Sequence, residues 1–317
     1  MSDLPDGAAE FVAGPVRVSV PATSANLGPG FDALGLALEF RDDVEAEVTP
    51  DGLEILVEGE GAGDVPLDET HLVVRAMHHV FDLLGARPPG LRLRCHNVIP
   101  HARGLGSSSA AIVGGVLLAR GLVADGVERL DDEAVFQLVA GIEGHPDNVA
   151  PALFGGLTVS GRDPEPGAEF WSATAPVAPG VGTVVFIPPT GLSTELARGL
   201  LPEQVPHADA SANGGRTALL VAALSGQPRW LVTATRDYLH QDYREPAMPH
   251  SLALVRALRA EGIAAVVSGA GPTVLAFVAD VSDPAAEAAL LARCPDGWTA
   301  RALPISTRGA QVTRDPR

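Results

Sequence analysis

The chain has 317 residues, of which 46% are hydrophobic and 19% are charged, and this composition is that of a globular protein long enough for two domains. Its formal net charge of −17 argues against a nucleic-acid partner held by phosphate neutralisation. All 22 basic residues are arginine, so the chain cannot use a Walker A lysine, the strand lysine of a protein kinase or a lysine Schiff base.

No apolar run approaches the ~20 residues that cross a bilayer, and the acidic start MSDLPDGAAEF lacks the apolar core of a secretory signal. Cys95 and Cys294 stand alone, which excludes a disulfide framework and a multi-cysteine metal site. We therefore expect a cytoplasmic protein without a membrane partner.

The first half of the chain shows both strand and helix patterns. Apolar residues at every second position predict half-buried strands at 16–20, 53–57 and 91–95. Helices are predicted from His71 to Gly85, up to about Leu122, and from the acidic residues 131–133 onward, with a turn back into a strand within 145–161. This half should be α+β, with helices on one side of a mainly antiparallel sheet.

Pro and Gly interrupt all periodicity at 161–180, and we predict a boundary there between an N-terminal domain, 1–165, and a C-terminal domain, 166–317. Strands are predicted at 182–189, on both sides of a Gly-Pro turn within 263–278, and at 297–304; helices are predicted at 193–202, 215–226, 228–240, 249–262 and 284–293. The resulting β-α-β-β-α-β order favours a ferredoxin-like second domain.

The segment PHARGLGSSSAA, 100–111, joins a predicted strand to a predicted helix. Gly104 and Gly106 permit positive φ and a close approach of backbone N–H groups to a ligand. The serines at 107–109 can cap the helix, and a helix N-terminus favours anions. A serine-capped helix without a ligand remains the alternative at this point.

Two further loops are rich in small and polar residues. PATSANLGPGFDALG, 21–35, holds Thr23, Ser24, Asn26 and Asp32 among several glycines, more special residues than a turn needs. SGAGPTVLAF, 268–277, lies between two apolar strands. A long polar loop and a plain hairpin are the respective alternatives.

The three loops together, in this order, resemble the motifs of the GHMP kinase superfamily, which includes galactokinases, homoserine kinases and mevalonate kinases. The resemblance extends from Val16 to Phe277. It implies an N-terminal domain like ribosomal protein S5 domain 2 and a ferredoxin-like C-terminal domain. It also implies binding of ATP by backbone N–H groups, a helix N-terminus and Mg²⁺, without a Walker lysine.

Within the superfamily the sequence is most similar to the homoserine kinases. ATSANLGPGFD, EGHPDNVAPALFGG, LSTELARGLLP and LHQDYREP carry this similarity, whereas GLGSSSA differs from the GGGSSD of the diphosphocytidyl-methylerythritol kinases. The resemblance implies ATP-dependent phosphorylation of the L-homoserine hydroxyl in threonine biosynthesis, and a homodimer. Three alternatives stay open. The first is another GHMP kinase that acts on mevalonate, shikimate or a sugar; the others are a non-catalytic binding protein and an inert scaffold.

The resemblance also implies roles for individual residues. By motif, Arg198 and Arg244 match the substrate-binding arginines of this family. A guanidinium can pair bidentately with a carboxylate, so both are expected to bind the substrate carboxylate. Thr194 lies one helical turn before Arg198 and can face the same ligand. The substrate set is Asn26, Asp32, His145, Asp147, Asn148, Thr194, Arg198 and Arg244. The nucleotide set is Pro100, His101, Ala102, Arg103, Gly104, Leu105, Gly106, Ser107, Ser108, Ser109 and Ala110, and the magnesium set is Ser107, Ser108 and Glu143.

Phosphoryl transfer depends mainly on positioning and electrostatic stabilisation, so a strong base is not required. We expect the homoserine hydroxyl to attack directly, oriented by Asn148. Asp32 and Asp147 are the two carboxylates that could act as a base instead. For His145 the alternative is a histidine that caps a turn.

Overall fold

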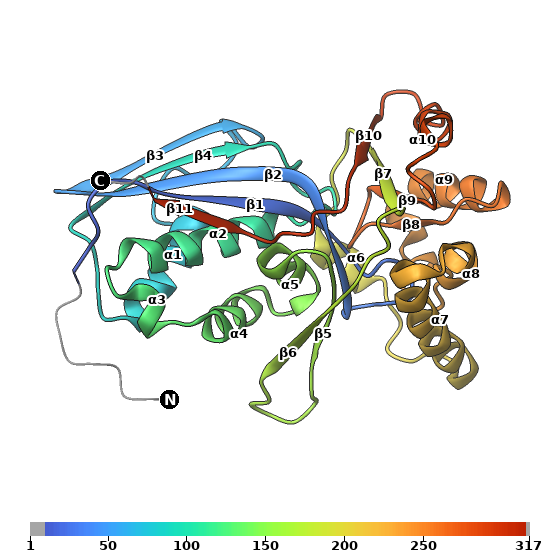
Figure 1. Cartoon of the computed structure of the whole chain (residues 1–317), viewed down its shortest axis with the longest axis horizontal. Coiled ribbons are helices and arrows are strands. Elements are labelled where there is room, and N and C mark those ends of the chain that lie inside the picture. The colour runs from blue at the N-terminus through green and yellow to red at the C-terminus, as the bar shows by residue number, and fades with distance from the viewer. Residues whose placement is uncertain (1–9, 315–317) are drawn as a thin grey trace.

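The computed structural model describes residues 10–314, which form two sheets with helices packed against them (Figure 1). The larger sheet contains β1 (Val16–Ala25), β2 (Leu34–Thr49), β3 (Gly52–Gly59), β4 (Gly90–Asn97), β5 (Leu157–Arg162), β6 (Phe170–Ala175) and β11 (Gln311–Arg314). Its helices are α1 (Leu72–Leu83), α2 (Ser107–Leu122), α3 (Gly126–Arg129), α4 (Asp132–Glu143) and α5 (Pro146–Phe154).

The larger sheet has the order β11-β1-β2-β4-β3, and β5 pairs with β2 and then with β6. Every pairing is antiparallel except β3 with β4. The helices lie on one face of this sheet, as predicted, while the last strand, β11, returns to pair with β1 (Figure 1). The proposed boundary between 165 and 166 separates β5 from β6, and it remains a proposal.

The smaller sheet contains β7 (Gly182–Ile187), β8 (Ala265–Val267), β9 (Val274–Val278) and β10 (Thr299–Leu303). Around it lie α6 (Thr194–Gly199), α7 (His207–Gly226), η1 (Pro228–Trp230), α8 (Leu231–Ala234), η2 (Asp242–Ala247), α9 (Pro249–Ala260) and α10 (Pro284–Leu291). The order β10-β7-β9-β8 is antiparallel throughout. This order confirms the predicted ferredoxin-like domain.

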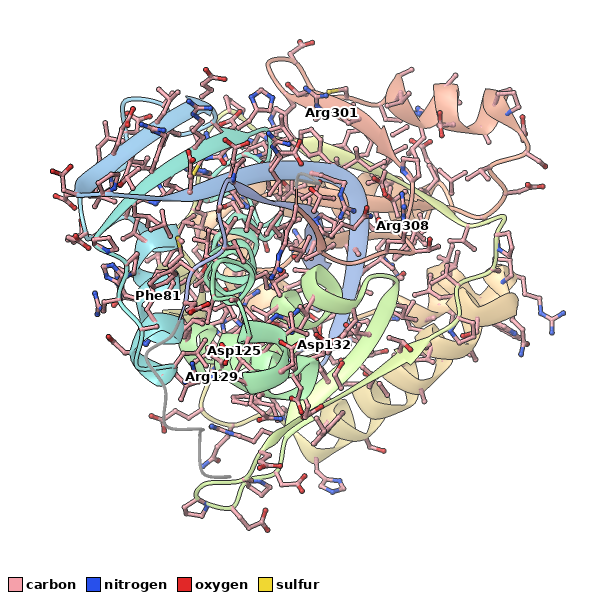
Figure 2. All side chains as sticks on the ribbon, turned by 60° about the vertical axis from the view of Figure 1, so that its left-hand side comes forward. Phe81, Asp125, Arg129, Asp132, Arg301 and Arg308 are labelled. Atoms are coloured by element: carbon pink, nitrogen blue, oxygen red, sulfur yellow. The ribbon has the colours of Figure 1, made fainter. Side chains whose placement is uncertain are left out.

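Helix α2 is buried along almost its whole length, between the sheet and α1, α4 and α5. It carries small residues where its neighbours approach most closely; a Cβ at Gly115 would lie 2.5 Å from the Val73 carbonyl of α1. At the far end of this helical layer Arg129 donates to the Leu84 carbonyl at 2.7 Å and lies 3.6 Å from the Asp125 carboxylate (Figure 2). This packing holds the N-terminus of α2 in one place.

Two local expectations are wrong and one is incomplete. The strand expected within 145–161 is β5, but the helix α5 precedes it at 146–154, because Pro146 suits the first helical position, Asp147 the first turn, and Gly155 ends it. The stretch 228–240 is not one helix, because the Asp237 carboxylate accepts the backbone N–H groups of residues 239–241 and so replaces helical hydrogen bonds. The interrupted region 161–180 contains the strand β6, which pairs with β5.

Within residues 10–314, no helix has both the length and the apolar character needed to cross a membrane.

Candidate active site

The three loops singled out in the sequence meet where β1 ends and β8 turns into β9. The Asn26 side chain donates to the Gly269 carbonyl at 2.9 Å. The Ser268 hydroxyl lies 2.6 Å from the Gly104 carbonyl and 2.8 Å from Ser24 Oγ, so it donates to the carbonyl and accepts from Ser24. Residues 244 positions apart therefore form one hydrogen-bonded unit.

A cavity of about 450 Å³ opens beside this unit. The cavity is lined by residues from segments that connect the strands of both sheets. Most of the predicted site residues are among them. These are Asn26, Ala102, Gly104, Gly106, Ser107, Ser108, Ser109, Glu143, His145, Asp147, Asn148, Thr194, Arg198 and Arg244.

The remaining predicted residues surround this cavity. His101 and Ala110 line a second, adjoining cavity. Leu105 is fully buried, and Arg103 donates to the Pro189 carbonyl at 2.5 Å, which anchors the loop. Pro100 is partly buried at the start of the loop, and Asp32 is bound by Arg198.

The second loop leads into α2 through glycines in the left-handed region, with φ of +74° at Gly104 and +72° at Gly106. Gly106 is the N-cap residue, and a Cβ on it would lie 1.9 Å from Thr23 Oγ1. No side chain caps α2, so the expectation that the serines cap it is wrong. They occupy the first turn instead, where their backbone N–H groups bond no acceptor within residues 10–314, and all three residues line the cavity.

Glu143, the last residue of α4, binds two of these serines. Ser108 Oγ donates to one carboxylate oxygen at 3.1 Å, and Ser109 Oγ donates to the other at 2.9 Å. Ser107 makes no such bond. Hydroxyl and carboxylate oxygens are hard ligands of the kind that Mg²⁺ takes beside substrate phosphates, so this pair fits a magnesium ion.

The central motif places three polar side chains on the first turn of α5 and the residue before it. His145 Nδ1 lies 3.0 Å from Asp147 Oδ1, and this bond to a buried carboxylate raises the pKa of His145. The His145 side chain makes no capping bond, although the residue stands at the N-cap. Asn148 Oδ1 accepts from the buried Thr23 hydroxyl at 2.7 Å, which leaves the Asn148 amide N–H₂ for a ligand.

Asp32 and Arg198 form a bidentate ion pair with distances of 3.0 and 2.6 Å. The carboxylate raises the pKa of Arg198, since its hydrogen bonds favour the charged guanidinium. Asp32 has a φ of +55°, and its backbone N–H donates to the Asn26 side chain at 2.9 Å, so the first loop itself holds the carboxylate in position.

Arg244 is the largest fully buried side chain, at 1% exposure. Nη1 donates to His240 Nδ1 at 3.1 Å and to the Gly269 carbonyl at 3.2 Å, and Nε donates to the Ala197 carbonyl at 3.3 Å. Burial lowers the pKa of Arg244 to about 10, and the nearby charge of Arg198 acts in the same direction. Within residues 10–314 no carboxylate pairs with it, so its charge is available to an anion in the cavity.

Sequence reasoning assigned no role to several residues that the structure brings to the site. Thr23, which fixes the Asn148 amide, was noted only as part of its loop. His71 has a buried Nδ1 atom without a hydrogen-bond partner among residues 10–314, and it lines the second cavity of about 270 Å³ together with Asp42 and the first serines of α2. The only signal for it was its position as the first residue of the predicted helix.

Two family models match the chain. Residues 71–156 match the GHMP kinases N terminal domain, and residues 219–296 match the GHMP kinases C terminal domain. A homoserine kinase of Streptomyces avermitilis is 54% identical over 95% of this chain and 97% of its own length. One from Clavibacter michiganensis is 51% identical over 94% and 93%, respectively.

Solved structures show the same fold. A homoserine kinase of Cytophaga hutchinsonii superposes with a TM-score of 0.80 at 24% identity, covering 96% of this chain and 99% of that one. The L. major mevalonate kinase in complex with R-mevalonate superposes with a TM-score of 0.70 at 18% identity, covering 94% and 98%. At these identities the superpositions support the fold alone.

Proposed function

The chain belongs to the homoserine kinases of the GHMP kinase superfamily, and we propose on this premise that it transfers the γ-phosphoryl group of ATP to the hydroxyl of L-homoserine. The product, O-phospho-L-homoserine, is a precursor in threonine biosynthesis. The observation that carries the proposal is a cavity that presents both signs of charge beside an anion-binding helix N-terminus.

L-Homoserine carries an ammonium and a carboxylate on one carbon atom and a hydroxyl two carbons away. Arg244, with its uncompensated guanidinium, suits the carboxylate, with Arg198 and Thr194 beside it. Asp32 and Asp147 supply the negative charge for the ammonium, and Asn26 and His145 complete the polar lining. A sugar would need no such charged clamp.

The second loop suits the phosphate groups of ATP. The free backbone N–H groups of residues 107–109 and the dipole of α2 supply the positive field that a lysine supplies elsewhere. The adjoining cavity, which reaches Ser107 and Ser108, suits the nucleoside. Gly104 and Gly106 keep the backbone open to the phosphates.

We propose that Glu143 and Ser108 hold Mg²⁺. Held by these two residues, the ion would supply positive charge that offsets the negative charge of the phosphate groups during transfer. Glu143 is positioned for this by the end of α4, and Ser108 by the first turn of α2.

The same geometry supports transfer without a dedicated base. Both oxygens of Asp32 accept from Arg198, and Oδ1 of Asp147 is bound to His145, so each carboxylate already has a cationic or hydrogen-bonding partner. Asn148 donates through its amide to the hydroxyl oxygen and aims a lone pair at the γ-phosphorus, while Thr23 holds the amide in that orientation. The new bond from the hydroxyl oxygen to the γ-phosphorus forms as the bond from that phosphorus to the β–γ bridging oxygen breaks; the hydroxyl proton passes to an oxygen of the transferred phosphoryl group, and ADP leaves.

The proposal is tested by incubating the protein with Mg-ATP and homoserine, mevalonate, shikimate, threonine or galactose and measuring ADP release. We expect turnover with homoserine well above that with every other compound. Turnover with mevalonate alone would identify the protein as another kind of GHMP kinase. Absence of ADP release with all five compounds would favour a non-catalytic binding protein.

The serine run offers a test of the metal site. Ser108→Ala is expected to raise the Mg²⁺ concentration for half-maximal activity by about tenfold, because loss of a partner at a metal site typically weakens binding 10–100-fold. Ser107→Ala, which removes a hydroxyl that does not contact Glu143, should shift it by less than about threefold. The measurement is a magnesium titration of the initial rate; an equal shift in both variants would contradict the assignment.

We further propose a cytoplasmic homodimer, as the resemblance to this family implies. Sedimentation at micromolar concentration distinguishes a dimer from a monomer of 32.6 kDa.

A further inference from the structure

His240 is completely buried and does not line the cavity. It stands in the turn before η2, where the Asp237 carboxylate accepts the His240 backbone N–H at 3.1 Å and that of Gln241 at 2.7 Å. Gln241 in turn accepts the backbone N–H of Val267 in β8 at 2.6 Å. The turn is therefore anchored to the smaller sheet, and the imidazole has little freedom to move.

The two ring nitrogens of His240 have different partners. Nε2 lies 2.7 Å from the Gly28 carbonyl, which can only accept, so Nε2 carries the proton. Nδ1 lies 3.1 Å from Nη1 of Arg244, which can only donate, so Nδ1 is the acceptor. Both contacts require the same neutral tautomer, and burial lowers the pKa of His240 in agreement with it.

The imidazole thus joins two parts of the proposed substrate site. Gly28 belongs to the first loop, which carries Asp32, and Arg244 belongs to η2. Phe31, also in the first loop, packs against the imidazole, with its ring centroid 5.1 Å from that of His240 in a stacked arrangement. The guanidinium carbons of Arg198 and Arg244 lie 5.5 and 5.6 Å from the same Phe31 centroid, within the range of cation–π attraction.

We infer that His240 is a positioning residue that aims the Arg244 guanidinium at the substrate carboxylate. A guanidinium has five donors in a planar fork, and bonds from Nε and Nη1 to Ala197, Gly269 and His240 leave Nη2 for a ligand. Nε donates to the Ala197 carbonyl, and Nη1 donates to both the Gly269 carbonyl and His240 Nδ1, so His240 takes the last N–H of Nη1 and fixes the rotation of the guanidinium. This inference rests on the proposed function, because it takes the ligand to be a carboxylate.

Two variants separate the two hydrogen bonds. His240→Asn places an amide atom where Nδ1 stands and can still accept from Arg244, whereas His240→Gln places one where Nε2 stands and can still donate to Gly28. The readout is kcat/KM for homoserine divided by that for 3-amino-1-propanol, which is homoserine without its carboxylate. This ratio reports the contribution of the carboxylate alone.

We expect His240→Gln to lower this ratio by about tenfold or more, since it removes a hydrogen bond to a charged group, while the KM for ATP stays within about threefold. His240→Asn should keep the ratio within about threefold. The double variant His240→Gln/Arg244→Met should show no lower ratio than Arg244→Met, because His240 acts through Arg244. A purely structural role would lower turnover of both substrates equally, and a retained ratio in His240→Gln overturns the inference.

The failure of the proposed function is distinguishable from the failure of this inference. If the wild-type protein phosphorylates neither compound, the function is wrong, and nitrogen-15 NMR of the substrate-free protein still decides on His240. We expect the neutral Nε2–H tautomer and a shifted Nδ1 resonance in Arg244→Met. A protonated imidazole, or an Nδ1 resonance that does not shift in Arg244→Met, would refute the hydrogen bond between His240 and Arg244.

Discussion

Glu143→Gln is expected to lower kcat by on the order of 10³-fold, because an ion that neutralises phosphoryl charge contributes several kcal/mol to the transition state. The amide can still accept from one serine, so the first turn of α2 should keep its position. The Mg²⁺ concentration for half-maximal activity should rise at the same time. The measurements are kcat and its magnesium dependence at saturating ATP and homoserine.

A matched control lies on the same helix. Glu133 is exposed in the first turn of α4, and among residues 10–314 its one side-chain partner is Gln137, at 2.8 Å. Glu133→Gln should leave both kinetic constants near those of the wild type. If Glu143→Gln instead lowered the melting temperature and kept the magnesium dependence, Glu143 would serve only as an anchor for Ser108 and Ser109.

Much of the site could be predicted because each loop carries its own local signature. Gly104 and Gly106 predict a backbone with positive φ, and both residues have a positive φ in the structure. Small residues along α2 predict close packing against its neighbours, and Gly115 is an example. Such features depend on residues that are close in the sequence, so they can be predicted from the sequence alone.

The contacts between loops could not be predicted in this way. Thr23 binds Asn148 across 125 positions, and Glu143 reaches Ser109 across 34. The serines do not cap α2 because Gly106 is the N-cap residue; they lie inside the first turn, where the Ser108 and Ser109 hydroxyls donate to Glu143 at the end of α4. Such side-chain contacts depend on how α2, α4 and α5 pack on one sheet. A local sequence pattern does not predict that packing.

The same limit applies to the charges. Arg198 and Arg244 looked equivalent in the sequence, as two arginines near the substrate. The structure differentiates them, because the guanidinium of Arg198 is already bound by Asp32 and that of Arg244 has no carboxylate partner within residues 10–314. A buried charge without a counter-ion is costly, so Arg244 should gain most from an anionic ligand.

Arg244→Lys should therefore reduce kcat/KM for homoserine by about 100-fold, close to 2.7 kcal/mol, since an ammonium keeps the charge but cannot be held through Nε and Nη1 while Nη2 donates to the carboxylate. Arg229→Lys changes an exposed arginine and serves as the control. Saturating homoserine should raise the melting temperature of the wild type and of Arg229→Lys but raise that of Arg244→Lys much less, because stabilisation follows ligand affinity. Equal stabilisation of all three proteins would show that Arg244 does not bind the carboxylate, and the clamp would then have to be Arg198, released from Asp32.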